Sequence, residues 1–134
     1  MKNRRLRISI IIAVIILIPL IGARLFYLRV ESNLKNLASA PVAAVNLDSV
    51  PDGAWTGRHK VFPIDVEVLV TVKDHAITDV KLVKHFNGQG GAAEKVPAEV
   101  VRRQSLAVDA VGGATYSSKV ILLAIRNALA GEAR

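Results

Sequence analysis

The residues best suited to chemistry lie near the C-terminus, in the stretch Gly112-Gly113-Ala114-Thr115 and in Tyr116, Ser117 and Ser118 after it. Adjacent glycines permit backbone conformations that a side chain forbids, and they let a ligand approach closely. The stretch leads into a predicted helix, whose first amides and dipole favour an anion. Hydroxyl groups gather at this same end. The spacing indicates a seat for a phosphate, although a tight interhelical turn with ordinary serine caps accounts for the same residues.

An acidic residue, Asp109, precedes the glycines and would repel a phosphate placed beside it. Its carboxylate could instead accept hydrogen bonds from backbone amides and hold the turn, or help to bind a metal during assembly. The sequence leaves these roles open.

Other catalytic constellations are not indicated. The chain has no cysteine, which removes thiol catalysis, disulfides and thiolate metal sites. The spacing of His59, His75 and His85 matches no compact set of metal ligands, so we expect no metal site. No Ser-His-Asp or paired-carboxylate arrangement can be argued either, and hydrolysis is not expected.

A valine-rich strand and a β-hairpin are the clearest predicted elements. From Ile64 to Lys73 apolar and polar residues alternate, which predicts a half-buried strand. Asp74-His75 interrupts the pattern, and a second strand follows over residues 77–83.

Two helices are predicted after the hairpin and a flexible loop at residues 86–95. Pro97 suits a first turn, so a short helix is expected over 97–104. A longer helix over 119–130 would be capped by Ser117 or Ser118 and stopped by Gly131. Strands followed by helices indicate an α+β fold, a small antiparallel sheet with two helices on one face.

The N-terminus carries a separate apolar segment. Residues 8–23 are almost continuously apolar and are preceded by four cations. A span needs about 20 residues, which is reached if Arg24 snorkels and the segment continues to Leu28. More cations before the run than after it favour a cytoplasmic N-terminus. Ile21-Gly22-Ala23 is a poor cleavage site, so we expect an uncleaved anchor rather than a signal peptide, and Pro19 argues against a buried core helix.

Most of the net charge of +7 comes from residues 1–30, which hold six Lys and Arg residues and no acidic residue. Twelve of the 18 Lys and Arg residues and all 11 Asp and Glu residues lie beyond residue 30, which leaves a net charge of +1 there. A nucleic-acid-binding face is therefore not expected. We divide the chain into an anchor at 1–30, a spacer at 31–50 and a folded domain at 51–134.

The stretch from Asp109 to Ser117 resembles the flavinylation motif of the FMN-binding domain family, Asp-x-x-Ser/Thr-Gly-Ala-Thr-x-Ser/Thr. The resemblance extends over about residues 50–131: Asp52-Gly53-Ala54-Trp55-Thr56-Gly57 is similar to the family's opening segment, and Gln104-Ser105 precedes the motif as in the family. The family includes flavin-bearing subunits of sodium-pumping NADH:quinone oxidoreductases and Rnf-type complexes. In such domains a flavin transferase uses FAD to esterify the last threonine of the motif with FMN.

The resemblance implies that Thr115 carries covalent FMN and that Asp109, Gly112, Gly113, Ala114, Tyr116, Ser117 and Ser118 surround it. His75 departs from the family, which commonly has Gly in this hairpin turn, so the resemblance implies a positive φ there, an angle at which histidine is enriched. Gly112 departs from the motif, which has Ser or Thr there. The backbone amide remains, so slower modification or looser seating is expected, not loss of function. Trp55 and Tyr116 are the candidates to stack on the flavin ring, Trp55 equally a core residue. His85 could approach the flavin, but a solvated position at the end of its strand is the preferred interpretation. Arg102-Arg103 is interpreted as the solvated face of a short helix.

The resulting expectation is a membrane-anchored electron-transfer protein whose domain faces the periplasm or cell exterior. Its expected partners are the transferase and redox proteins near the membrane, and it is a carrier rather than a stand-alone enzyme. Two alternatives stay open: a non-redox ligand-binding module, and a structural subunit of a membrane complex with the same fold.

Overall fold

The computed structural model describes residues 2–86 and 90–131. Its internal contacts divide the chain into two compact units, Met1–Ser32 and Asn33–Arg134. The first unit consists of most of helix α1 (Lys2–Ser39), and the second contains the sheet and the other helices.

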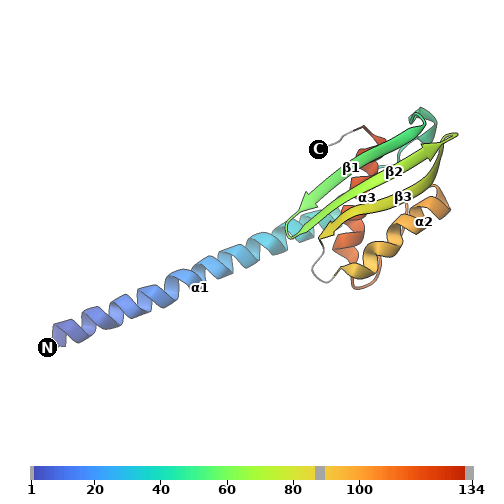
Figure 1. The fold of residues 1–134 in the computed structure, drawn as a ribbon. Coiled ribbons are helices and arrows are strands. Elements are labelled where there is room, and N and C mark those ends of the chain that lie inside the picture. Colours follow the sequence, from blue (N-terminus) through green and yellow to red (C-terminus); the bar gives the residue numbers. More distant parts are fainter. Residues whose placement is uncertain (1, 87–89, 132–134) are drawn as a thin grey trace. The chain divides into compact units, whose positions relative to one another are not determined.

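A three-stranded antiparallel sheet in the order β1-β2-β3 is the centre of the second unit (Figure 1). Its strands are β1 (Gly53–Val61), β2 (Ile64–Lys73) and β3 (Ala76–Phe86). The predicted bounds of β2 are confirmed. Its alternate side chains from Ile64 to Val72 are at most 5% exposed and form the centre of the core. Strand β1, which pairs with β2 from Ile64 to Val72, was not predicted from the sequence.

The β2–β3 hairpin turns on Asp74 and His75, with φ values of 50° and 59°. The positive φ expected of His75 is confirmed. Two consecutive positive angles are what a two-residue type I′ hairpin requires.

Helices α2 (Val96–Arg103) and α3 (Thr115–Leu129) pack behind the sheet in Figure 1, α2 against β3 and α3 against β1 and β2. The buried face of α3 is an apolar stripe, since Ile121, Ala124, Ile125 and Ala128 are at most 1% exposed. The predicted stop is also found: Gly131 has φ 69° directly after the helix.

One glycine allows α3 to lie close against β1. A Cβ built on Gly57 would lie 2.1 Å from the carbonyl oxygen of Ala124 and 2.4 Å from the amide nitrogen of Ala128. The backbone of the helix occupies the space where a side chain would be, so Gly57 sets the distance between strand and helix.

The end of α2 is attached to the start of β3 by Gln104. Its Oε1 accepts a hydrogen bond from the Ile77 amide at 2.7 Å, and its Nε2 donates to the Ile77 carbonyl at 2.8 Å. Gln104 has φ 50°, which ends the helix. The segment after α2 therefore starts from a fixed point on the sheet.

The predicted loop at 86–95 contains a short 3-10 helix, η2 (Gly91–Lys95), while residues 87–89 lie outside the described part. The stretch before the sheet includes a second 3-10 helix, η1 (Leu47–Ser49). Leu37 and Val50, in the stretch expected to be a spacer, are each 4% exposed within the second unit. This stretch therefore contributes to the core of the domain.

The first unit is a helix that is apolar along most of its length. One stretch of α1 within Ile10–Ser39 is long and apolar enough to cross a membrane, with a mean hydropathy of 2.5. Its large side chains from Ile10 to Leu28 are 42–65% exposed. Pro19 lies inside the helix, as membrane-spanning helices tolerate. A membrane anchor and a signal sequence both have these properties.

Candidate functional site

The glycine stretch forms a β-turn over Val111–Ala114. The Ala114 amide donates a hydrogen bond to the Val111 carbonyl at 2.9 Å. Gly113, at the third position of the turn, has φ 78°, which a type II turn requires there. A Cβ on Gly112 would meet no atom within 4 Å, so the missing side chain of Gly112 leaves open space.

Ser118 holds this turn against the helix. Its hydroxyl accepts a hydrogen bond from the Val111 amide at 3.0 Å and donates one to the Ala114 carbonyl at 2.9 Å. The side chain is fully buried, at 0% exposed. Both ends of the turn are thus hydrogen-bonded to one hydroxyl, which stabilises the conformation of the turn before Thr115.

Helix α3 begins at Thr115, four residues earlier than expected. Ala114 is the N-cap and makes no side-chain capping bond, so the predicted caps Ser117 and Ser118 are wrong. Both serines lie inside the first turn and are buried, at 2% and 0% exposed. Thr115 and Tyr116 are the exposed residues of this turn.

The environment of the Thr115 hydroxyl favours an anion. Amides at the start of a helix have no partner within it, and the helix dipole is positive there. The first turn of α3 contains no acidic residue. Val108 and Val111 pack against the core, while Asp109 and Gly112 are exposed.

Lys119, which was not predicted as part of the site, lies one turn further along the helix. Lys119 follows Thr115 at i+4 and is half-exposed. Residues four apart share one face of a helix, so the ammonium group can reach a phosphate held at Thr115. The spacing was visible in the sequence, but the helix was expected to start only at Lys119.

Trp55 lies far from Thr115. It lines a small cavity with Leu129, the last residue of α3, while Thr115 is the first. A helix of 15 residues is about 22 Å long. Trp55 packs against the core, and its Nε1 donates to the Pro51 carbonyl at 3.0 Å. The structure therefore favours the packing role of Trp55 and leaves Tyr116, 38% exposed, as the aromatic residue beside the turn.

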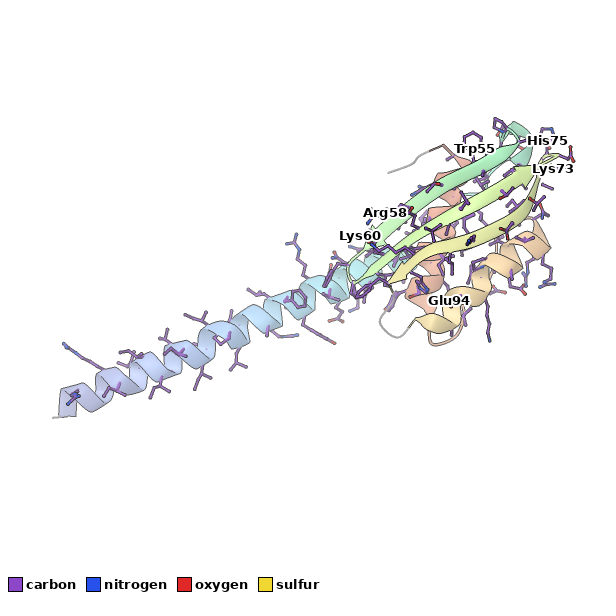
Figure 2. All side chains as sticks on the ribbon, in the orientation of Figure 1. Trp55, Arg58, Lys60, Lys73, His75 and Glu94 are labelled. Atoms are coloured by element: carbon purple, nitrogen blue, oxygen red, sulfur yellow. The ribbon has the colours of Figure 1, made fainter. Side chains whose placement is uncertain are left out.

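The histidines do not come together. In register, His59 and His85 flank Val66 on the two outer strands, which puts their backbones about 10 Å apart. His75 lies in the hairpin turn at one end of the sheet (Figure 2). Among the described residues, no three His, Asp or Glu side chains gather as metal ligands.

The expected solvated position of His85 is wrong, because its side chain is 4% exposed and its Nδ1 lies 3.2 Å from Glu94 Oε1.

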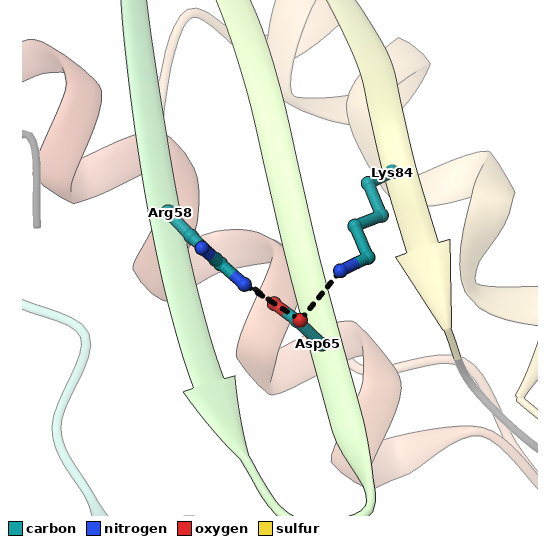
Figure 3. A network of polar contacts seen from close by, with 3 residues as sticks. All are labelled: Arg58, Asp65 and Lys84. Carbon is teal, nitrogen blue, oxygen red and sulfur yellow. Dashed lines mark hydrogen bonds and ion pairs between the residues drawn. The ribbon is translucent and has the colours of Figure 1, made fainter.

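A charged cluster lies on β1, β2 and β3, formed by Arg58, Asp65 and Lys84 (Figure 3). Arg58 Nη2 and Lys84 Nζ each donate to Asp65 Oδ2 at 2.8 Å. These hydrogen bonds and the two positive charges hold the pKa of the Asp65 carboxyl well below its usual range. The cluster connects the three strands.

The arginines at the end of α2 have the solvated position expected of them. Their side chains are 65% and 44% exposed, and both pair with Glu99. Hydrogen bonds from Arg102, with smaller contributions from Arg103, lower the pKa of Glu99. Exposed pairs of this kind contribute little to stability.

Comparison with known proteins identifies the family. The chain is an α+β domain with a glycine turn that presents a threonine at a helix start. Residues 63–130, just over half of the chain, match the family model for the FMN-binding domain, and the chain belongs to that family. The match begins after β1, so the proposed similarity of Asp52–Gly57 lies outside it. No curated protein and no solved structure gave a match.

The residues of the turn fit an FMN phosphate. Thr115 is exposed at the start of α3, Lys119 follows it four residues later, and no acidic residue lies between Asp109 and the end of the first helical turn. The Asp109 carboxylate is exposed, so it can turn into solvent when an anion is bound. The empty space at Gly112 leaves room beside the turn.

Proposed function

We propose that this protein is a membrane-anchored electron-transfer flavoprotein whose FMN is joined by a phosphoester to Thr115. The observation that carries the proposal is the exposed Thr115 hydroxyl at the first position of α3, in a domain of the FMN-binding family. A covalent link keeps the cofactor from diffusing away outside the cytoplasm, where it is not readily replaced.

The attachment is a transfer of FMN from FAD. The Thr115 oxygen forms a bond to the FMN phosphorus, the pyrophosphate bond of FAD breaks, AMP leaves and the hydroxyl proton is released. No electrons are exchanged in this step. A dedicated flavin transferase catalyses it, and this chain supplies the acceptor.

The residues around Thr115 would hold the phosphate and the ring of FMN in different ways. The amides of Thr115, Tyr116 and Ser117 and the dipole of α3 stabilise the phosphate charge. Lys119 adds a positive charge from the next turn, and Tyr116 can stack on the ring. Ser118 keeps the turn in place. Bound FMN supplies the redox chemistry, and the chain holds it and shields it from competing reactions.

The membrane location rests on α1. Four cations precede its apolar run, and cations flanking the run favour the cytoplasm on the side where they are more numerous. We infer that α1 stays uncleaved and places the domain in the periplasm or outside the cell, where it passes electrons between redox partners near the membrane.

Intact mass tests the proposal. The full chain is produced with a flavin transferase and FAD, and its mass should rise by one FMN less one water. A flavin absorbance band should survive denaturation. The Thr115→Ala variant should gain no mass, while the matched change Thr78→Ala, at an exposed threonine of β3, should leave the modification intact.

An unshifted mass, with the transferase shown to be active on another acceptor, contradicts the covalent carrier. The domain would then be a non-redox binding module or a structural subunit. Fractionation of cells and the mass of the mature chain test the anchor separately, since cleavage of a signal would remove most of the apolar run and release the domain from the membrane.

A further inference from the structure

A second recessed surface lies away from Thr115, within the second unit. It is a groove of about 650 Å³ formed by the last turns of α1, the end of β1 and the middle of α3. Leu37, Val61 and Leu123 are among its apolar lining residues. Thr115 and the glycine turn are not part of it, so the flavin proposal does not account for it.

The polar lining of this groove is positively charged. Lys60 and Arg126 contribute positive charges, and His59, Asn33 and Asn36 add uncharged polar groups. No Asp or Glu is among the described residues that line it. The pKa of His59 is lowered, first by its partial burial and then by the positive charge of Arg126.

Arg126 is held in a fixed orientation. Its Nη2 and Nε donate to Asn127 Oδ1 at 2.8 and 3.2 Å. Asn127 is 7% exposed and donates in turn to the Arg58 carbonyl on β1 at 2.9 Å. A guanidinium positioned from the core in this way is suited to recognise a phosphate with little loss of side-chain freedom.

The covalent structure places the groove near the end of the apolar segment. Asn33, which lines the groove, lies five positions after Leu28, where the apolar run ends. Even a fully extended chain of that length spans at most about 18 Å. If α1 crosses a membrane, as proposed above, the groove is therefore within reach of the headgroup region, whatever the orientation of the domain.

We propose that this groove binds the phosphate of an anionic phospholipid headgroup, on the outer face of the membrane that α1 crosses. The basic side chains match the phosphate charge, and the apolar lining matches the glycerol and the first methylene groups of the lipid. This inference rests on the proposed membrane anchoring and is independent of flavin at Thr115. Such a contact would restrain the domain near its redox partners.

The test follows the groove residues by NMR in the full chain, kept in zwitterionic detergent micelles. Short-chain phosphatidylglycerol is titrated in, with short-chain phosphatidylcholine and inorganic phosphate as parallel titrations. Phosphatidylglycerol should shift the His59 ring and the Asn36 side-chain amide in a saturable way, and the other two should not. Equal shifts with inorganic phosphate would overturn the assignment to a lipid, and no saturable shift with any of them would overturn the site.

Charge variants identify the residues involved. Lys60→Gln and Arg126→Gln should each weaken phosphatidylglycerol binding by about five-fold. Lys73→Gln is the matched control, because Lys73 lies at the opposite end of the sheet from Lys60 (Figure 2). Lys60 is exposed, so its replacement tests the site even if the Arg126 variant disturbs Asn127. An equal loss in the Lys73 variant would contradict the proposal.

Because the micelle experiment needs neither flavin nor an intact membrane, its failure is distinguishable from failure of the anchor or of Thr115.

Discussion

The hydroxyl of Ser118 accepts a hydrogen bond from the amide of Val111 across the turn that presents Thr115. The two residues are seven positions apart, and the same hydroxyl donates to the carbonyl of Ala114. One buried side chain therefore connects both ends of the glycine turn to the first turn of α3. The geometry of the proposed FMN acceptor depends on a residue that is itself inaccessible to the cofactor.

We predict that Ser118→Ala slows flavin attachment without removing the acceptor. The Val111 amide loses its partner, and the cost of an unmade buried hydrogen bond is about 1–3 kcal/mol. The initial rate of FMN incorporation should fall, while Thr115 remains the modified residue by peptide mass. Ser49→Ala, at an exposed serine in η1, is the control. An unchanged rate in the Ser118 variant would show that the turn holds its shape without this hydroxyl.

The two glycines should respond differently to substitution. Gly112→Ser restores the hydroxyl that the family motif has at this position, and the structure has open space for it. We expect faster FMN incorporation and unchanged stability. Gly113→Ala should instead cost about 1 kcal/mol or more, because alanine is strained at φ 78°. Rates of incorporation and denaturant unfolding separate the two effects, and equal behaviour of the variants would contradict the geometry of the turn.

Lys119 should assist attachment through its charge. Lys119→Gln is expected to reduce the rate of FMN incorporation by about two- to five-fold, as removal of a partly exposed charge pair does. The difference from the wild type should shrink at high salt, because exposed charges are screened. Lys81→Gln on β3 is the matched control. A deficit that stays constant as salt is raised would assign Lys119 a packing role.

The Asp65 cluster predicts a loss of stability in acid. The folded-state pKa of Asp65 lies below its unfolded value of about 3.9, so its contribution is complete above that pH and is lost as the pH falls further. Asp65→Asn should reduce the unfolding free energy by about 1–3 kcal/mol at pH 7. This difference should diminish below about pH 4, where the wild-type carboxylate becomes protonated. Denaturant unfolding at several pH values measures it, and a difference that does not change with pH would refute the charged role of Asp65.

The parts of the fold that could be predicted are those with strong local signals. The valine alternation of β2 gave its bounds, since period-two burial leaves one arrangement for the strand. Strand β1 was missed because Gly53 and Gly57 interrupt the pattern, and Gly57 is there for contact with α3, a tertiary requirement. The start of α3 was misplaced because Ala114, its N-cap, makes no capping bond that residue type could reveal.

In the candidate site, too, the features with a local sequence signal could be predicted, and those that depend on tertiary structure could not. The glycines and Thr115 were visible as a motif, and the family match covers them. The role of Ser118 depends on where the helix begins, and the distance of Trp55 from Thr115 depends on which end of α3 faces the start of β1. Neither follows from spacing along the chain.

The contacts of Gln104 with Ile77 have a consequence for protein engineering. Together with the Ser118 bonds, they fasten the segment from Ser105 to Ala114 at both ends to parts of the domain that do not depend on its middle. Its exposed centre, at Asp109 and Ala110, is then a point where the chain can be lengthened or redesigned at low entropic cost. A peptide tag inserted between Asp109 and Ala110 would report on the surroundings of Thr115 while leaving the acceptor turn and the sheet unaltered.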